Sequence, residues 1–216
     1  MNQNIKDWKL TVGLEVHIQL STKSKMFCRC PVLYGSTPNS LICPICLALP
    51  GALPIINKEV INMAIKLGYA LNFKINQKTE FARKNYYYPD LPKGYQITQF
   101  DKPICENGNI EIKKDDNVHK IGITRAHIEE DSGKLIHHSD NFSFIDLNRA
   151  GSPLIEIVSE PEIHSSEEAK LYLEKLKQTI KYIDISDCDM EKGNLRVDIN
   201  VSVNKKNDSK LGTRRE

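Results

Sequence analysis

Apolar and polar residues alternate in several separate stretches of the chain, which is the pattern of strands with one buried face and one polar face. This alternation predicts strands over residues 10–20, 110–113, 118–129, 142–148, 154–158 and 195–203. Helical periodicity is confined to two longer segments. The sequence therefore predicts an α+β fold, in which a largely antiparallel sheet is covered by two main helices.

The two predicted helices are marked by their first residues. Asn57 is a suitable N-cap for the first helix. Ser165 and Glu168 have the S-x-x-E spacing of a capping box at the start of the second. The apolar stripes are Val60, Ala64, Leu67 and Leu71 in the first helix, and Ala169, Tyr172, Leu173, Leu176, Ile180 and Ile183 in the second. Both helices are expected to cover the core.

The end of the sequence predicts one more turn. Residues 204–210 are rich in Lys, Asn, Asp and Ser, which is typical of a turn between strands. A second hairpin strand would begin at residues 214–216, where the sequence stops. We therefore expect the chain to end inside a hairpin.

The polar positions of the predicted strands carry an unusual set of side chains. Glu15 and His17 lie two residues apart and so share one strand face. The same spacing recurs at His127 and Glu129, Asp146 and Asn148, Arg196, Asp198 and Asn200, and Glu156 stands alone in its strand. Carboxylates and imidazoles are ligands for divalent cations, and crowded carboxylates repel one another without one. The pattern predicts a concave, acidic floor that binds magnesium. The alternative is a solvated face with scattered acids.

Four of the six cysteines fall within a short segment, as Cys28-x-Cys30 and Cys43-Pro-Ile-Cys46. Two such pairs of thiolates can surround one zinc ion tetrahedrally and stiffen a loop that contains Pro and Gly. Because four sulfurs fill the coordination sphere, this zinc is expected to be structural rather than catalytic. Four unrelated buried or free cysteines are the alternative.

A third candidate segment is residues 83–96, where cations and tyrosines alternate. Such a segment suits a nucleotide or the acceptor end of a tRNA, through phosphate pairing and base stacking. A tyrosine-rich loop that merely covers the core is an equal alternative.

Composition and charge limit the classes of protein to which this sequence can belong. Hydrophobic residues make up 40% and charged residues 27% of the 216, which fits one globular domain. The net charge of +2 does not indicate a polyanion-binding surface, so any contact with nucleic acid must be local. The most apolar stretch, residues 41–56, contains three prolines, which excludes a membrane helix, and residues 1–7 lack the features of a secretory signal. A cytoplasmic location is the default expectation.

Several motifs together resemble a known family. They are Val12 to His17, Arg83 to Ile97, Ile123 to Lys134, and Asp146 to Pro161. Over nearly the whole chain these residues resemble the B subunit of the aspartyl/glutamyl-tRNA amidotransferase family, in its N-terminal catalytic part. The resemblance implies that residues 1–216 form one catalytic cradle domain, with a zinc-knuckle loop at residues 28–46. It also implies that the helical and tail domains of longer members are absent. The expected location is the bacterial cytoplasm, with an organellar origin as the alternative.

The resemblance implies a function and a set of site residues. The family uses ATP to phosphorylate the side-chain carboxylate of Glu-tRNA(Gln) or Asp-tRNA(Asn), and then amidates it with ammonia. By resemblance, the magnesium ligands are Glu15, His17, Glu129 and Glu130, and Glu156 and Asp198 are further catalytic residues. Contacts with ATP or the acceptor end are assigned by resemblance to Lys84, Asn85, Tyr88 and Arg149.

The expected partners follow from the same chemistry. The sequence has no P-loop and no G-x-G-x-x-G motif, so any ATP is not held by a P-loop or a Rossmann turn. It has no G-x-S-x-G motif and no convincing Cys/His nucleophile pair, so the chain should not release ammonia from glutamine itself. The resemblance implies a glutaminase partner, the amidase or A subunit, which supplies ammonia, together with a small C subunit and misacylated tRNA. Two alternatives remain: a zinc-stabilised tRNA-binding module without catalysis, and a stand-alone metal hydrolase acting on phosphate esters.

Overall fold

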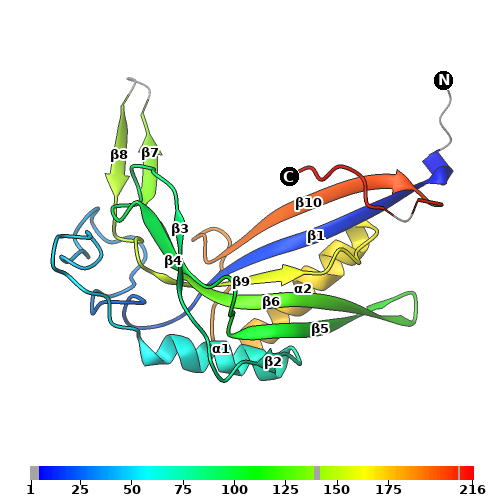
Figure 1. Ribbon diagram of the computed structural model, residues 1–216, viewed down its shortest axis with the longest axis horizontal. Helices are drawn as coiled ribbons and strands as arrows, with labels where there is room; N and C mark the ends of the chain where they lie inside the picture. Colours follow the sequence, from blue (N-terminus) through cyan, green and yellow to red (C-terminus); the bar gives the residue numbers. More distant parts are fainter. Residues whose placement is uncertain (1–4, 139–141, 209) are drawn as a thin grey trace.

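The computed structural model describes residues 5–138, 142–208 and 210–216. A six-stranded antiparallel sheet forms the body of the molecule (Figure 1). Its strands, in spatial order, are β10 (Leu195–Lys205), β1 (Trp8–Gln19), β9 (Pro153–Ser159), β6 (Asn117–Glu130), β5 (Cys105–Lys114) and β2 (Lys74–Ile75). A short 3-10 helix, η1 (Ile5–Asp7), precedes β1. The predicted fold class is confirmed.

Both α-helices lie on one face of this sheet, α1 (Lys58–Ala70) beneath β2, β5 and β6, and α2 (Ser166–Tyr182) against β5 (Figure 1). The predicted caps are confirmed. The Asn57 side chain accepts a hydrogen bond from the Glu59 amide, and Ser165 accepts one from the Glu168 amide. The Glu168 carboxylate in turn accepts from the amide of His164, so both partners of the capping box satisfy free N–H groups at the helix start.

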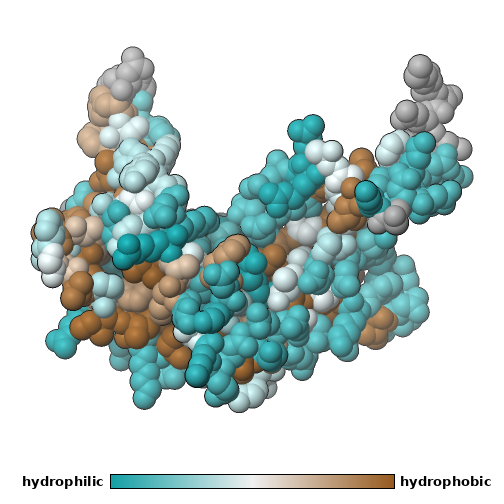
Figure 2. Space-filling model, in the orientation of Figure 1, coloured by the Kyte–Doolittle hydropathy of each residue, from teal (hydrophilic) through white to brown (hydrophobic). Residues whose placement is uncertain are grey.

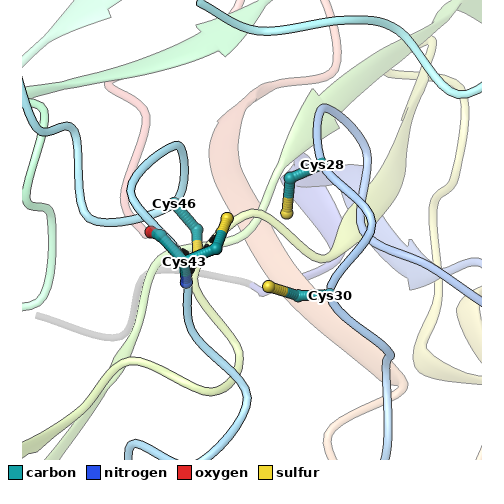
Figure 3. A group of neighbouring side chains, drawn as sticks. All are labelled: Cys28, Cys30, Cys43 and Cys46. Atoms are coloured by element: carbon teal, nitrogen blue, oxygen red, sulfur yellow. Dashed lines mark hydrogen bonds between the residues drawn. The ribbon is translucent and has the colours of Figure 1, made fainter. Parts of the chain in front are cut away.

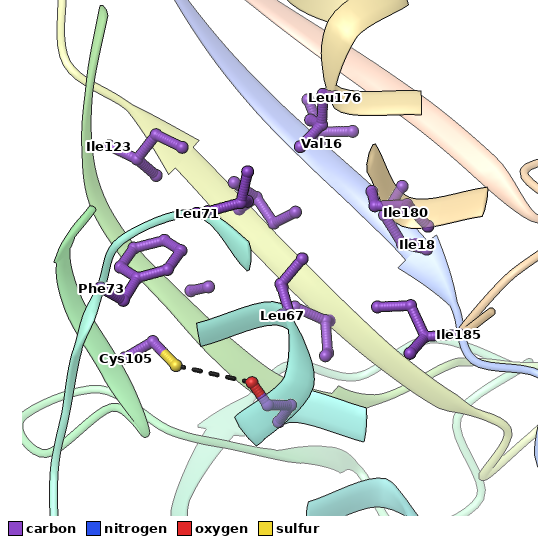
Figure 4. Close-up of a cluster of buried hydrophobic side chains, with 14 of the residues drawn as sticks. Val16, Ile18, Leu67, Leu71, Phe73, Cys105, Ile123, Leu176, Ile180 and Ile185 are labelled. Atoms are coloured by element: carbon purple, nitrogen blue, oxygen red, sulfur yellow. Dashed lines mark hydrogen bonds between the residues drawn. The ribbon is translucent and has the colours of Figure 1, made fainter. Parts of the chain in front are cut away.

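The hydrophobic core fills the space between the sheet and the helices. Figure 4 shows Val16 and Ile18 of β1 facing Leu176 and Ile180 of α2, with Leu67 of α1 nearby. These side chains are at most 1% exposed. Their burial stabilises the fold because each removes apolar surface from water, at roughly 25 cal/mol per Å². The core therefore occupies only one side of the sheet and leaves the other side free for polar residues.

Two short two-stranded sheets stand at one end of the large sheet: β3 (Ala82–Asn85) with β4 (Tyr95–Thr98), and β7 (Lys134–His137) with β8 (Ser143–Asp146). At the opposite end, β1 and β10 rise above the plane of the sheet (Figure 1). Figure 2 shows the hollow between these two raised ends. The polar face of the sheet is therefore the floor of a concave surface, which we call the basin.

The predicted strands all exist, with bounds that differ by a few residues. β5 begins five residues earlier than the predicted strand, and β8 is shorter than its prediction at both ends. Sequence reasoning missed β2, β3, β4 and β7, because these strands are short or carry polar and aromatic side chains instead of a clear alternation.

The predicted turn after β10 is present in the described residues. The chain reverses, and Val201 and Arg215 exchange two backbone hydrogen bonds of 2.7 and 2.8 Å. Residue 209 of this turn and residues 1–4 of the N-terminal segment lie outside the described residues. Among the helices that the structure describes, none has the length and apolar character needed to cross a membrane.

Candidate active site and zinc site

The strand register brings four polar residues into one row across the basin. His17 of β1 lies opposite Arg196 of β10 on one side and Glu156 of β9 on the other, and Glu156 lies opposite His127 of β6. Directly opposite residues of an antiparallel sheet project from the same face. Since Val16 and Ile18 point into the core, this row points into the basin.

The row closes into a compact cluster with Glu129. The His17 Nε2 atom lies 3.4 Å from a carboxylate oxygen of Glu156 and 3.7 Å from one of Glu129. The His127 Nε2 atom lies 3.3 Å from the same Glu156 oxygen. On the other side of the His17 ring, Nδ1 lies 3.5 Å from Asp198. The basin floor therefore holds two imidazoles among three carboxylates.

Burial makes this cluster electrostatically unusual, because Glu129 is 2% and Glu156 is 6% exposed. Burial, helped by the charge of Glu156, raises the pKa of Glu129. Burial would also raise the pKa of Glu156, but hydrogen bonds with His127 and His17 outweigh it and hold that pKa below its usual range. Burial would lower the pKa of His17, but its hydrogen bond with Glu156 and the two carboxylate charges raise it. The cluster therefore favours bound positive charge.

The donor set fits a hard divalent cation. His17, Glu129 and Glu156 each offer a ligand atom, and these atoms lie within 4.8 Å of one another. Carboxylate oxygens with one imidazole are suitable ligands for Mg²⁺ or Mn²⁺. A cation there would also neutralise two buried carboxylates that otherwise repel each other.

The predicted magnesium ligands divide into three groups. The structure brings His17 and Glu129 together. Glu15 lies on the same face in the next row, where its carboxylate accepts a hydrogen bond of 2.8 Å from the Asn200 side chain. Glu130 lies on the other side of β6, because consecutive strand residues alternate between faces. In the described residues, neither Glu15 nor Glu130 joins the three-residue cluster.

Glu130 belongs to a separate buried environment. Its carboxylate accepts hydrogen bonds of 2.7 Å from the Lys93 ammonium and 2.9 Å from the Ile97 amide. A cavity of about 110 Å³ lies beside it, bordered by Cys46 and the fully buried Lys25. Burial raises the pKa of Glu130, although Lys93 opposes this shift.

The other predicted contact residues surround the basin. Lys84, on β3, is close enough for its charge to act on the pKa of Glu129. Asn85 ends the same strand and is exposed, and Tyr88 is 54% exposed in the loop between β3 and β4. The Arg149 guanidinium already uses two of its N–H donors within the protein, since it donates to the carbonyls of Ser132 and Gly133 at 3.0 and 2.6 Å.

Sequence reasoning did not assign roles to several residues that shape the site. His127 was visible in the alternating pattern, but its contact with Glu156 depends on the register of β6 and β9. Thr98 donates a 3.1 Å hydrogen bond to Glu129 from β4, a strand that the sequence did not predict. The Arg196 guanidinium lies 3.0 Å from Asp131, although the two residues are 65 positions apart. Only the three-dimensional pairing reveals these contacts.

The four clustered cysteines converge as predicted. Figure 3 shows Cys28 and Cys30 on one loop facing Cys43 and Cys46 on another, and their sulfur atoms lie within 4.8 Å of one another. The Cys43 and Cys46 sulfurs are 3.8 Å apart. Four sulfurs at about 2.3 Å from one zinc ion would be about 3.8 Å apart, so the set fits tetrahedral zinc. The hydrogen bond between Cys28 and Cys46 lowers the pKa of the Cys46 thiol and raises the pKa of the Cys28 thiol.

Comparison with known proteins gives a consistent result. The family model described as "GatB/GatE catalytic domain" matches residues 10–216. A Campylobacter jejuni protein, named as the B subunit of an aspartyl/glutamyl-tRNA(Asn/Gln) amidotransferase, is 57% identical over 209 residues, which cover 97% of this chain and 44% of the relative. Proteins of the same name from Persephonella marina and Carboxydothermus hydrogenoformans are each 53% identical, over 97% and 98% of this chain and 44% and 45% of the relatives.

The chain thus spans less than half the length of these relatives. The family model nevertheless covers almost every residue of the sheet, the helices and both candidate metal sites. The fold, the basin cluster and the sequence match therefore agree, and the chain belongs to the GatB/GatE catalytic domain family.

Proposed function

We propose that this chain is the catalytic domain of an amidotransferase subunit that converts Glu-tRNA(Gln) or Asp-tRNA(Asn) into the amidated form, using ATP and ammonia. The family match supports this proposal. The observation that carries it is the cluster of half-buried His17 with buried Glu129 and Glu156 on the floor of an open basin.

The reaction needs two steps because a carboxylate is a poor electrophile. An oxygen of the substrate's side-chain carboxylate first attacks the γ-phosphorus of ATP, and ADP leaves. The nitrogen of ammonia then attacks the acyl carbon, the carbon–oxygen bond to phosphate breaks, and phosphate leaves as the nitrogen loses a proton. Phosphoryl transfer depends mainly on positioning and on neutralising charge.

The residues of the basin suit these requirements. His17, Glu129 and Glu156 would hold a magnesium ion, which when bound supplies positive charge against phosphate oxygens. His127 and Asp198 act as positioning residues, since each contacts a member of this set. Glu15 lies one row away, where its carboxylate is bound by Asn200, while Glu130 borders the neighbouring cavity together with Lys93.

The remaining assignments concern binding. Lys84, Asn85 and Tyr88 border the basin, and we assign them to the phosphates or to the acceptor end of the tRNA. Arg149 contributes mainly by holding the segment of residues 131–133 in place. The four clustered cysteines would hold a structural zinc that fixes the loop over residues 28–46.

The proposed function requires partners. Ammonia must reach the basin without being protonated to ammonium in bulk water, so we assign its release to an amidase partner, the A subunit, assembled with a small C subunit. The relatives are more than twice as long as this chain, and we assign binding of the tRNA body to their remaining length.

The test is Glu129→Gln in the full-length subunit assembled with both partners. This change keeps the shape of the side chain and removes its charge. ATP-dependent amidation of misacylated tRNA should fall at least about 100-fold, because even residues that only support metal ligands cost 10- to 100-fold. Binding of misacylated tRNA, measured by filter retention, should not change. The control is Glu174→Gln, on the solvent side of α2.

Unchanged amidation by Glu129→Gln would remove this site from the mechanism. If the unaltered complex bound the tRNA and never amidated it, the alternative of a zinc-stabilised tRNA-binding module would replace the proposal. Hydrolysis of phosphate esters by the subunit without partners would instead favour a stand-alone hydrolase.

A further inference from the structure

A β-bulge in β6 changes which side chains face the basin. Ile123 pairs with Ser159 of β9, yet Arg125 pairs with the very next residue, Val158, so Thr124 is an extra residue in the ladder. Up to this point the apolar residues of β6 that pack in the core are Ile121 and Ile123, and beyond it they are Ala126 and Ile128. The bulge therefore turns Arg125 onto the same face as His127 and Glu129.

Arg125 holds an unneutralised charge in that position. Among the described residues its guanidinium has no ion pair, and its buried Nε atom has no hydrogen-bond partner. The opposite residue on β5 is Glu106, but this carboxylate accepts a 2.9 Å hydrogen bond from Asn76 instead. A partly buried guanidinium without an anion is costly, which indicates that an anionic ligand completes the site.

An exposed aromatic ring lies beside this guanidinium. The Arg125 Cζ atom is 5.8 Å from the centre of the Phe100 ring, and Phe100 is 67% exposed. The neighbouring residue, Gln99, is 1% exposed and anchors the segment. Its side-chain oxygen accepts hydrogen bonds of 3.0 Å from the Ile128 amide and 3.3 Å from the Ile104 amide, and its nitrogen donates to Thr79. An exposed ring is thus held in place by a buried support.

The pair stands one row away from the candidate metal cluster. Arg125, Val158, Glu15 and Asp198 form one row across the basin, and His127, Glu156 and His17 belong to the next row. Two residues along a strand span about 6.6–6.8 Å. A polyphosphate held at the cluster can therefore extend toward Arg125, over the half-buried Val158.

We propose that Arg125 and Phe100 form the nucleotide subsite of the basin, with the guanidinium binding a phosphate of ATP and the ring stacking on adenine. The planar fork of Arg matches phosphate oxygens, and aromatic rings stack on bases. This assignment rests on the proposed function, because it takes ATP as the nucleotide. It adds two binding residues to the candidates: Arg125 on β6 and Phe100 in the segment after β4, whereas Lys84 and Asn85 lie on β3.

The experiment measures equilibrium binding of Mg·ATP to the full-length subunit assembled with its partners, by calorimetry. Arg125→Ala should raise the Kd about 10- to 100-fold, the range for a lost charge-assisted hydrogen bond. Phe100→Leu should raise it about five- to tenfold through lost stacking. The Kd of Arg125→Lys should lie between that of the unaltered protein and that of Arg125→Ala, because lysine keeps the charge but lacks the planar guanidinium fork. Lys120→Ala removes one exposed charge from the same strand and should leave the Kd unchanged.

Two further measurements separate the possible outcomes. Mn²⁺ binding without nucleotide should be unaffected by Arg125→Ala or Phe100→Leu, and circular dichroism should show a folded protein.

If the unaltered complex binds ATP and both variants bind it equally well, the subsite is wrong while the proposed function stands. If binding of misacylated tRNA weakens and ATP binding does not, the pair holds the acceptor end and the assignment to ATP is overturned. If the unaltered complex does not bind ATP, the proposed function itself fails.

Discussion

At the scale of single residues, His17 is the centre of the basin. One ring nitrogen faces Glu156 and Glu129, and the other faces Asp198. A metal ligand must present a free nitrogen lone pair, so the orientation of this ring decides whether the cluster can bind a cation. Asp198 lies 3.5 Å from Nδ1, on the side of the ring away from the two glutamates, where its charge favours a proton on that nitrogen.

This arrangement predicts a pH dependence of metal binding. The pKa of His17 is raised above its ordinary value of 6.5, so a proton occupies the cation position at low pH. Affinity for Mn²⁺ should therefore rise as the pH increases through this pKa, and level off above it. Calorimetric titration of the full-length subunit from about pH 6 to 9 measures this curve. A flat curve for the unaltered protein, or an unchanged slope in His17→Asn, would contradict the role of His17.

The sequence could predict these residues but not which of them lie in contact with one another. Spacing by two places Glu15 and His17 on one face, and the same rule separates Glu129 from Glu130 once the strand is accepted. The family resemblance groups Glu130 with Glu129 and so hides this separation. The position of Arg125 could not be deduced, since alternation fails at a bulge and nothing local in the sequence marks one.

At the scale of elements, the loop over residues 28–46 depends on the clustered cysteines. It contains little regular structure, and Cys43 and Cys46 hold one of its turns through a 3.0 Å hydrogen bond from the Cys43 amide to the Cys46 sulfur. Such a segment has few buried apolar contacts of its own, so a metal bound by the four cysteines would be its main source of order. The same loop borders the cavity beside Glu130.

We expect Cys43→Ala to lower the zinc content of the purified full-length subunit from about one ion to almost none, and to lower Tm, because structural zinc contributes folding free energy. Atomic absorption and a thermal scan measure the two effects. The control is Cys105→Ala, which removes a buried cysteine outside the cluster and should keep the zinc. Full zinc content in Cys43→Ala would show that the cysteines do not form this site.

Elements were predicted well where periodicity was strong. The capping residues Asn57 and Ser165 located both helix starts, because side-chain caps are read directly from sequence. The β3–β4 and β7–β8 hairpins were missed wholly or in part, since their strands are short and their polar and aromatic residues give no clear alternation. These two hairpins form one wall of the basin (Figure 1). The depth of the basin therefore could not be predicted from the sequence either.

At the scale of the whole molecule, the fold places the hydrophobic core and the candidate active site on opposite faces of the sheet. Both helices and the apolar core lie on one side of the sheet, and the polar cluster lies on the other. The basin is open, which suits a large substrate and a delivered reactant better than a small molecule that must be enclosed. This openness agrees with a site that is completed by other subunits.

Under the proposed function, the assembled enzyme should depend on the proposed amidase partner only for ammonia. With that partner's nucleophile removed, amidation supported by glutamine should stop, and amidation supported by ammonium chloride should persist. The second rate should rise with pH, because un-ionised ammonia is the reactant. Product formation on misacylated tRNA measures both rates. Glutamine-dependent activity from the subunit alone would contradict this division of labour.

The bulge in β6 has one more consequence, which concerns the spacing of residues along the strand. It acts as a one-residue spacer, so that even-numbered positions line the polar side before it and odd-numbered positions line that side after it. Adding or deleting one residue between Thr124 and Glu129 would reverse the alternation beyond the bulge. The side chains that now face the basin, among them that of Glu129, would then point toward the core. Changes of length nearer the β5–β6 turn leave that frame untouched. Natural variation in length should therefore be confined to the turn side of the spacer.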